Sequence, residues 1–223
     1  MHQQISKKIF FYIAVLILLG SINNLNFYYF EFPKIKKIDI TGINNEQKIR
    51  MLKNLDYMKF QNIFFLETLR VNKIISSNNL IEKYYIHKRY PSTLKIEIIK
   101  TEILANLLKD GSNYLVGANG KLIETTALDE SKPFIFGKID IKSFINLKNK
   151  LENSNFDYEN IKNFYFFNSD RWDLEMKDGI LIKLPQKNID KALKMIFEFI
   201  SENKLNDINI IDARINNQII ING

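Results

Sequence analysis

The sequence has 223 residues, of which 46% are hydrophobic and 13% aromatic, and its formal net charge is +7. That length and apolar content are sufficient for one large or two small packed domains and exclude wholesale disorder. Lysines alternate with acidic residues and asparagines instead of forming a dense basic stripe, which argues against a nucleic-acid-binding face. The absence of cysteine excludes disulfides, thiolate nucleophiles and cysteine-ligated metals.

The N-terminal segment carries an uncharged stretch over residues 9–30, preceded by Lys7 and Lys8. It begins IFFYIAVLILLGSI and ends in an aromatic run at 27–30, which is typical of a bilayer interface. A helix needs about 20 residues to cross a bilayer. We therefore predict a transmembrane helix over 9–30 after a short cytoplasmic tail over 1–8.

Two other interpretations of this segment are a cleaved signal peptide and a buried core helix. The first lacks a convincing small-residue cleavage site, and the second would show one apolar stripe instead of an apolar surface all round. Lysines on both sides of the segment leave the charge bias nearly balanced. Because long domains translocate largely regardless of that bias, we expect the bulk of the chain on the outer side of the membrane.

Residues 34–101 show the pattern of a two-layer module with one core. Alternating Ile35, Ile38 and Ile40 predict a strand that ends in a turn at Gly42. The segment NNEQKIRMLKNL predicts a helix capped by an asparagine.

The buried stripe of this helix is expected at Ile49 and Leu52, with Leu55 as a further candidate. A second helix is expected near 69–77, with Val71, Ile74 and Ile75 on one face. Two strands then follow, LIEKYYIHK and TLKIEIIK, separated by the turn RYPS. The expected order is strand, helix, helix, strand, strand, which leaves free sheet edges on which another chain's strand can hydrogen-bond.

Residues 102–223 are predicted to form an antiparallel β-rich domain, so that the whole chain is α+β. Turn signals at Asp110–Gly111 and Asn119–Gly120 suggest a meander. The clearest hairpin is centred on Asp178–Gly179, because alternate apolar residues lead into it and out of it. We expect these flanking residues on the buried face: Trp172, Leu174, Met176, Ile180, Ile182 and Leu184. Trp172 is expected in the core.

The chain closes with a helix and strand-like runs. A helix over about 188–203 is predicted from Ile189, Leu193, Ile196 and Ile200, which share one face. The last segment, INIIDARINNQIIING, contains two short strand-like runs around Asp212 and Arg214. A sheet that ends this way can leave its last pairing position to another protein.

An enzymatic function has little support in the sequence. The histidines are His2, in the tail, and His87, in a predicted strand, where a lone histidine is far more often a surface or core residue than a base. No glycine-rich phosphate loop and no metal-ligand spacing accompanies them. We therefore expect no catalytic, cofactor-binding or metal-binding residues and no cofactor.

The turn at Tyr90–Pro91 has two interpretations. Proline fixes the turn before the next strand and favours an extended conformation at the preceding residue, which is a structural role. The functional alternative is a recognition corner for another membrane protein.

The motifs taken together resemble those of the bacterial cell-division family FtsQ, called DivIB in other lineages, over nearly the whole chain. They are ITG at 40–42, NIFFL at 62–66, RYPSTLKI at 89–96, RWDLEMKDG at 171–179 and IDAR at 211–214. The sequence departs from the family pattern at Ile103, where a proline is usual, and at Gly117, where an aspartate is common.

The resemblance implies a cytoplasmic tail, one membrane helix, a POTRA domain and a β domain, in a scaffold of the division machinery at the septum. It implies binding to the single-pass division proteins FtsB and FtsL, and a part in controlling septal peptidoglycan synthesis. The family docks a partner strand on the late strand after its DxR motif. Carried onto this chain, the docking residues are Ile215, Asn217, Ile219 and Ile221, flanked by Asp212 and Arg214.

Two other functions are compatible with parts of the pattern. A POTRA-containing envelope assembly or transport component is expected to continue into a β-barrel. An envelope enzyme is expected to have a concave pocket lined by titratable groups.

Overall fold

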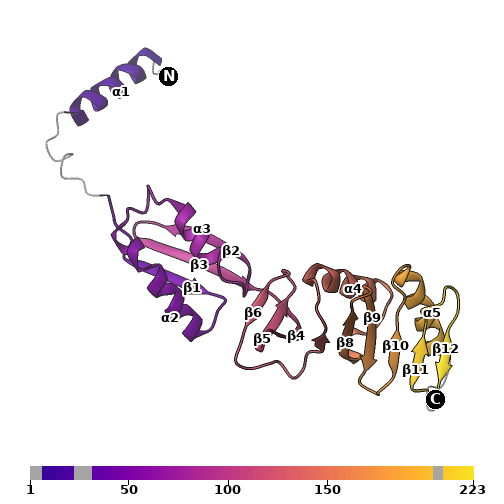
Figure 1. Ribbon diagram of the computed structural model, residues 1–223. Coiled ribbons are helices and arrows are strands. Elements are labelled where there is room, and N and C mark those ends of the chain that lie inside the picture. The colour runs from indigo at the N-terminus through magenta and orange to yellow at the C-terminus, as the bar shows by residue number, and fades with distance from the viewer. Residues whose placement is uncertain (1–6, 23–31, 203–207) are drawn as a thin grey trace.

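The computed structural model describes residues 7–22, 32–202 and 208–223, and these form an α+β protein. Figure 1 shows the N-terminal helix α1 (Lys7–Ile22), then a first module of mixed helices and strands, then a second, β-rich module. Within the described ranges, no helix combines the length and the apolar character that a bilayer crossing requires. Part of the predicted membrane span, residues 23–30, lies outside the described residues.

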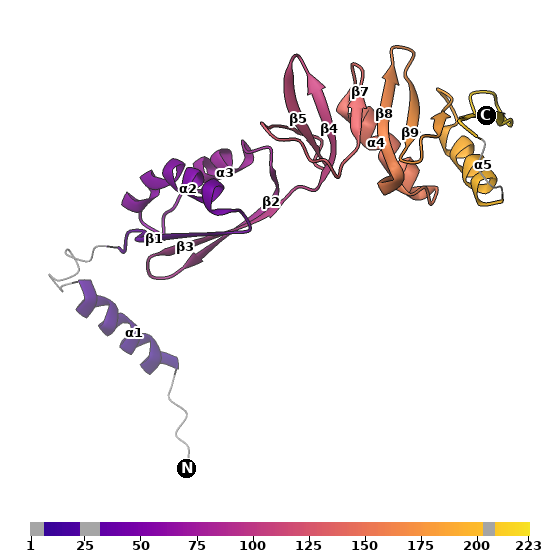
Figure 2. The same ribbon diagram turned by 90° about the horizontal axis from the view of Figure 1, so that it is seen from below.

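The first module is a three-stranded sheet with two helices on one face (Figure 2). Its elements are β1 (Lys37–Thr41), α2 (Asn45–Asn54), the 3-10 helix η2 (Asp56–Phe60), α3 (Thr68–Ser76), β2 (Ile81–Arg89) and β3 (Thr93–Lys100). The strands lie in the order β1-β3-β2, with β1 parallel and β2 antiparallel to β3. The predicted order of elements is confirmed.

The first helix of this module has a complete capping box at Asn44. The Asn44 side chain accepts a hydrogen bond from the Gln47 N–H at 2.9 Å, and the Gln47 side chain accepts one from the Asn44 N–H. The predicted buried stripe is wrong at Ile49, which is 67% exposed, while Met51 and Leu55 are buried. Met51 and Leu55 are four residues apart and therefore share one helix face, from which Ile49 is turned away.

The second module is built on one nine-stranded sheet in the order β12-β11-β10-β9-β8-β7-β4-β5-β6. Its strands are β4 (Ile103–Lys109), β5 (Ser112–Gly117), β6 (Leu122–Glu124), β7 (Phe134–Phe136), β8 (Ile161–Phe167), β9 (Arg171–Met176), β10 (Leu181–Lys183), β11 (Ile210–Asp212) and β12 (Ile220–Asn222). The predicted meander is seen in β4, β5 and β6, and the predicted Asp178–Gly179 hairpin joins β9 to β10.

The prediction of an antiparallel β-rich domain is correct for five strand pairs and wrong for three. The pairs β4·β7, β7·β8 and β10·β11 are parallel. Helix α4 (Ile141–Asn153), which was not predicted, connects β7 to β8, and α5 (Ile189–Glu202) lies between β10 and β11. Parallel neighbours need crossover connections. Helices α4 and α5 supply two of them, and β5, β6 and the loop after β6 connect β4 to β7.

The core of the second module lies between the sheet and these helices. Trp172 is 2% exposed, which confirms its predicted place in the core. Its ring stands edge-on to Phe164, and Phe144 of α4 in turn stands edge-on to Phe164 at 5.3 Å between centroids. Aromatic packing of this kind joins the helix to the middle of the sheet.

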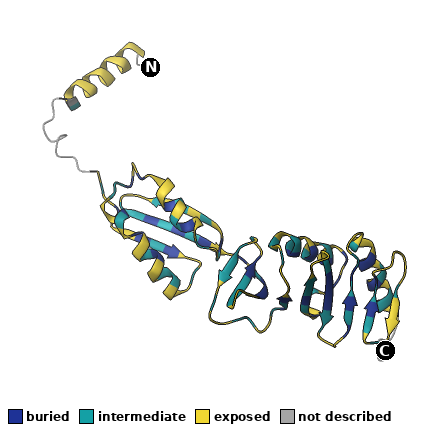
Figure 3. Ribbon diagram, in the orientation of Figure 1, coloured by how far each residue is buried: buried dark blue, intermediate teal, exposed yellow. Residues whose placement is uncertain are grey.

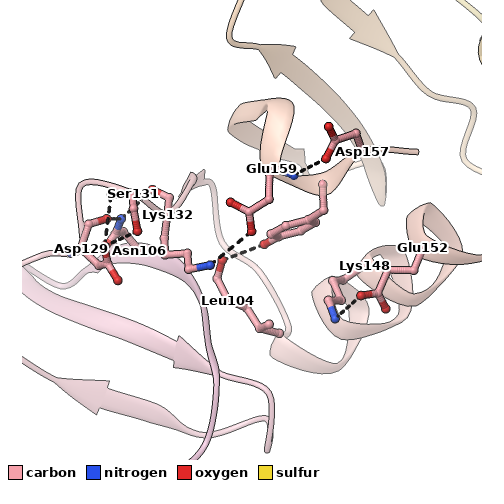
Figure 4. Close-up of polar contacts among 10 residues, drawn as sticks. Leu104, Asn106, Asp129, Ser131, Lys132, Lys148, Glu152, Asp157 and Glu159 are labelled. Carbon is pink, nitrogen blue, oxygen red and sulfur yellow. Dashed lines mark hydrogen bonds and ion pairs between the residues drawn. The ribbon is translucent and has the colours of Figure 1, made fainter. Parts of the chain in front are cut away.

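A buried asparagine holds the long loop that leads to β7 (Figure 4). The Asn106 amide donates to the carbonyls of Asp129 at 2.7 Å and Lys132 at 2.9 Å, and its oxygen accepts from the Asp129 N–H at 3.0 Å. Nearby, the Tyr158 hydroxyl donates to the Leu104 carbonyl at 2.8 Å, and burial raises the pKa of that hydroxyl. These bonds align β4, β7 and the start of β8 in one sheet.

Asparagine side chains also join the two modules. Asn119, in the turn between β5 and β6, donates its amide to the carbonyls of Asn79 at 3.0 Å and Ile81 at 3.3 Å. Asn79 in turn donates to the carbonyl of Leu122 at 2.8 Å. A cleft of about 900 Å³ lies beside this junction, between α2, α3 and the edge formed by β5 and β6.

Gly117 makes this junction compact. A Cβ at this position would lie 2.7 Å from the Asn119 Oδ1 and 2.8 Å from the Thr101 methyl group. The departure from the common aspartate therefore has a local reason, because Asn119 and Thr101 occupy the space that a side chain at 117 would need.

Candidate partner-binding edge

The strand β12 is one of the two edges of the nine-stranded sheet. It pairs antiparallel with β11, through Ile210–Asn222, Ile211–Ile221 and Asp212–Ile220, and no other described strand pairs with it. All three of its residues are exposed, and the strand is yellow in Figure 3. An exposed edge of this kind is a template for pairing with another chain.

The register shows which main-chain groups of β12 are open. The Ala213 N–H donates to the Lys183 carbonyl, so the main-chain N–H and C=O groups of odd-numbered residues in and after β11 face β10. Its even-numbered residues then face β12, where they meet Ile220 and Asn222. By the same alternation, the N–H and C=O of Ile221 point away from β11, toward the open side.

The side chains of this edge form an incomplete apolar face. Ile221 lies opposite Ile211, which is fully buried, yet Ile221 itself is 51% exposed. Ile219 is partly buried and packs on the core. The core face of the sheet therefore continues to its last strand, where it is only partly covered.

The predicted docking strand over 215–221 is corrected at its beginning. Ile215 and Asn217 lie in a turn, not in a strand, and β12 starts only at Ile220. The Gln218 N–H donates to the Ile215 carbonyl at 3.2 Å, and Asn217 has a φ of +59°. Asparagine tolerates this left-handed conformation, which turns the chain back on itself and breaks the alternation.

Asp212 and Arg214 bind each other. The Arg214 Nε lies 2.9 Å from both Asp212 carboxylate oxygens, and the Arg214 main-chain N–H also donates to Asp212 at 3.0 Å. The hydrogen bonds from Arg214 lower the pKa of Asp212. This pair holds the chain at the end of β11, at the start of the turn that leads to β12.

Tyr90 and Pro91 lie elsewhere, in the turn between β2 and β3. Strand β2 begins beside the junction with the second module and is nine residues long, so its far end is roughly 30 Å from that junction. Tyr90 is 59% exposed and stacks on Phe64 at 4.7 Å between centroids. The structure thus separates the predicted partner-binding residues into two groups, and the recognition corner at Tyr90 remains a prediction.

A polar network that the sequence patterns did not lead us to predict lies on the sheet face opposite the helices. The Tyr165 hydroxyl donates to the Glu175 carboxylate at 2.5 Å, and Asn163 and Lys162 also donate to it, at 2.8 and 2.9 Å. These hydrogen bonds lower the pKa of Glu175 to about 2. Its signal in the sequence was the polar alternate positions of β8 and β9, opposite the buried ones.

Next to that network, Asp173 is only 4% exposed and lies 3.2 Å from Arg171. Burial raises the pKa of Asp173, and the nearby Arg171 charge opposes that shift. In the described part of the chain, no three or more histidine, aspartate or glutamate side chains form a metal site. The network ties neighbouring strands together.

Two protein-family models match the chain. One, described as the POTRA domain of FtsQ type, matches residues 33–100, and the other, described as cell division protein FtsQ/DivIB, C-terminal, matches residues 106–214. The second match ends at Arg214, before β12 begins at Ile220.

Curated relatives with the same family name are similar to this chain. The cell division protein FtsQ of Rickettsia bellii is 29% identical over 175 residues, which are 77% of this chain and 65% of that protein. FtsQ of Bradyrhizobium diazoefficiens is 26% identical, over 71% of this chain and 48% of that protein. The chain thus spans less than two thirds of these relatives' length. The extracytoplasmic domain of the cell division protein DivIB from Geobacillus stearothermophilus is 14% identical with a TM-score of 0.33, covering 47% of this chain and 98% of that one.

Proposed function

This chain belongs to the FtsQ/DivIB family of cell division proteins, and from that premise we propose that it is a membrane-tethered, non-catalytic scaffold of the division machinery at the septum. Its function is to bind other division proteins and so to help control septal peptidoglycan synthesis. The features that support this proposal are an apolar N-terminal helix, two folded modules and an open strand at the end of the larger sheet.

The tether is the uncharged stretch 9–30. Its described part belongs to α1, whose side chains from Ile9 to Leu19 are exposed and largely apolar. Such a surface is stable in hydrocarbon and costly in water. The bulk of the chain, including both modules, then lies on the periplasmic side of the inner membrane.

The partners are single-pass division proteins like FtsB and FtsL, and they bind by adding a strand to β12. The observation that carries this proposal is the one-sided pairing of β12, with the main-chain groups of Ile221 directed outward. Hydrogen bonds to that strand supply affinity, and the half-covered Ile221 side chain supplies register.

Two neighbouring proline substitutions test this mechanism. Ile221→Pro removes the outward N–H donor and is expected to weaken partner binding at least tenfold, or about 1.4 kcal/mol, with little change in the unfolding temperature. Ile220→Pro removes an N–H that faces β11, so it should lower the unfolding temperature as well as the affinity. The measurements are fluorescence anisotropy with a labelled FtsB-like extracytoplasmic segment and thermal unfolding by circular dichroism. Unchanged affinity in a folded Ile221→Pro variant would exclude β12 as the docking edge.

A further inference from the structure

The end of the first module that is farthest from the second module carries an exposed aromatic cluster. Phe32 lies edge-on to Phe64 at 5.9 Å and to Phe65 at 5.4 Å between centroids, and Phe64 stacks on Tyr90. The exposed fractions are 45% for Phe32, 46% for Phe64, 72% for Phe65 and 59% for Tyr90. We call these four residues the aromatic end.

The two central phenylalanines are held outward by a rigid frame. Ile63 and Leu66, on either side of them in the sequence, are buried in the core. The Phe64 N–H donates to the Asn62 side chain at 2.8 Å, and the Lys88 ammonium donates to the Phe64 carbonyl at 3.3 Å. The exposure of these two rings is therefore imposed by packing on both sides, and exposed apolar patches of this kind mark contact surfaces.

The segments that form the aromatic end are basic. Residues 32–37, 57–66 and 88–92 contain no acidic residue. The basic residues in these three segments are Lys34, Lys36, Lys37, Lys59, Lys88 and Arg89. Three acidic residues, Glu31, Asp56 and Glu67, directly flank the segments, and Asp56 pairs with Lys59, so the basic residues still outnumber the acidic ones by two to one. Aromatic rings flanked by lysine and arginine are the composition that binds at the interface of an anionic bilayer, where the rings enter the headgroup layer and the cations meet the phosphates.

The covalent chain keeps this surface close to α1. Nine residues separate Ile22, the last residue of α1, from Phe32. Whatever path they take, a chain of that length reaches at most about 35 Å. The β12 edge lies beyond the first module and the whole sheet (Figure 1), so the aromatic end is the surface that the tether brings nearest to a membrane.

We propose that the aromatic end is a second membrane contact, which rests on an anionic lipid headgroup surface beside the tether. This inference rests on the proposed tether in α1 and goes beyond it. With two contacts instead of one, the first module has a defined orientation on the membrane.

The absence of cysteine makes a direct test possible. The full chain is reconstituted in vesicles of phosphatidylethanolamine and phosphatidylglycerol that contain a lipid with a nitroxide on its headgroup. A single cysteine replaces Phe65 and carries a small apolar fluorophore. The matched control is Leu108→Cys, because Leu108 is an exposed apolar residue of the second module, with 61% exposure. We expect at least threefold stronger quenching at position 65 than at position 108.

A second variant tests the rings and the charges. With the fluorophore at Tyr90→Cys, the double substitution Phe64→Ser/Phe65→Ser should reduce quenching at least threefold, and replacement of phosphatidylglycerol by phosphatidylcholine should reduce it as well. Both phenylalanines are exposed, so the fold is expected to survive. Equal quenching at positions 65 and 108 in a chain that floats with the vesicles would overturn the membrane contact and leave the tether intact. A chain that fails to float would overturn both.

Discussion

The two edges of the nine-stranded sheet differ in what lies beside them. At β6, the first module lies close by, and the Asn79 amide donates to the Leu122 carbonyl. A cleft between the modules borders the rest of this edge. At β12, the described residues provide no further strand, and all three residues of the strand are exposed. The same sheet thus has one edge that the first module partly covers, across a cleft, and one edge, β12, whose three residues are all exposed.

This difference shows how a strand-binding protein can restrict where partners add. Any uncovered edge can pair with an extended segment, so a sheet with two open edges would bind partners in two places or aggregate. Within the nine-stranded sheet, the first module partly covers β6, whereas no described strand lies beyond β12. The partner site that we propose is therefore defined by the partial cover at β6 as much as by the exposure of β12.

The largest expected contrast comes from matched prolines at the two edges. The Gly117 N–H donates to Lys121 and the Thr125 N–H donates to Asn113, so by alternation the main-chain groups of Glu124 face outward from β6. Glu124→Pro should change partner affinity less than twofold, whereas Ile221→Pro should reduce it at least tenfold. Anisotropy titrations of both variants with the same labelled partner segment provide the comparison. A similar loss in both would show that the covered edge also binds.

A smaller effect is expected from the ion pair that precedes the open edge. Asp212→Asn should cost about 1 kcal/mol of unfolding free energy at pH 7, because the carboxylate accepts charge-assisted bonds from Arg214. The folded-state pKa of Asp212 lies below its ordinary value, so this stabilisation is present above the ordinary pKa of 3.8 and is lost as the pH falls through the folded-state pKa.

Urea unfolding of the wild type and of Asp212→Asn at pH 7 and pH 3 measures this difference. The gap between the two proteins should shrink at pH 3. Glu198→Gln, which changes an exposed acid on α5, is the control and should show no such pH-dependent gap. A gap of equal size at both pH values would mean that the Asp212 charge does not stabilise this corner.

The smallest effect on partner binding is expected at the covered edge. Asn119→Ala removes the amide bonds to Asn79 and Ile81, worth roughly 1 kcal/mol together, and should loosen the junction while partner affinity stays within twofold. Spin labels at Ile99→Cys and Leu108→Cys report the distance between the modules, and its distribution should broaden. Asn160→Ala, a substitution within the second module, should leave it narrow. An unchanged distribution in Asn119→Ala would show that other contacts hold the modules together.

Local patterns in the sequence predicted the first module well. The order of its elements, the Asn44 cap and the turn at Gly42 follow from spacing and capping rules. Gly42 has a φ of +91°, and a Cβ there would lie 1.8 Å from the Ile98 carbonyl oxygen, so only glycine fits. The Asp178–Gly179 hairpin could be predicted equally well, because alternating apolar residues and a two-residue turn are both local signals.

Features that depend on distant pairing were missed. Phe144, Leu147 and Leu151 carried a helical period that was not recognised, and without α4 the parallel crossovers could not be inferred. Of the candidate site, a strand after Arg214 was predictable from its isoleucines. The short length of β12 could not be predicted, because the isoleucines alternate through 215–221 in the sequence although the turn at Asn217 interrupts the strand. The exposure of Phe64 and Phe65 was equally hidden, since apolar residues in a short run are expected to be buried.

The unbroken order of strands also makes the second module a spacer of defined height. Nine strands at about 4.8 Å apart place β12 roughly 38 Å from β6, and β2 adds roughly 30 Å of the first module below it. If the first module stands on the membrane, a partner must rise by up to about 70 Å to reach its docking position. An α-helix rises 1.5 Å per residue, so a helical partner would need on the order of 45 residues between its membrane anchor and the strand that pairs with β12.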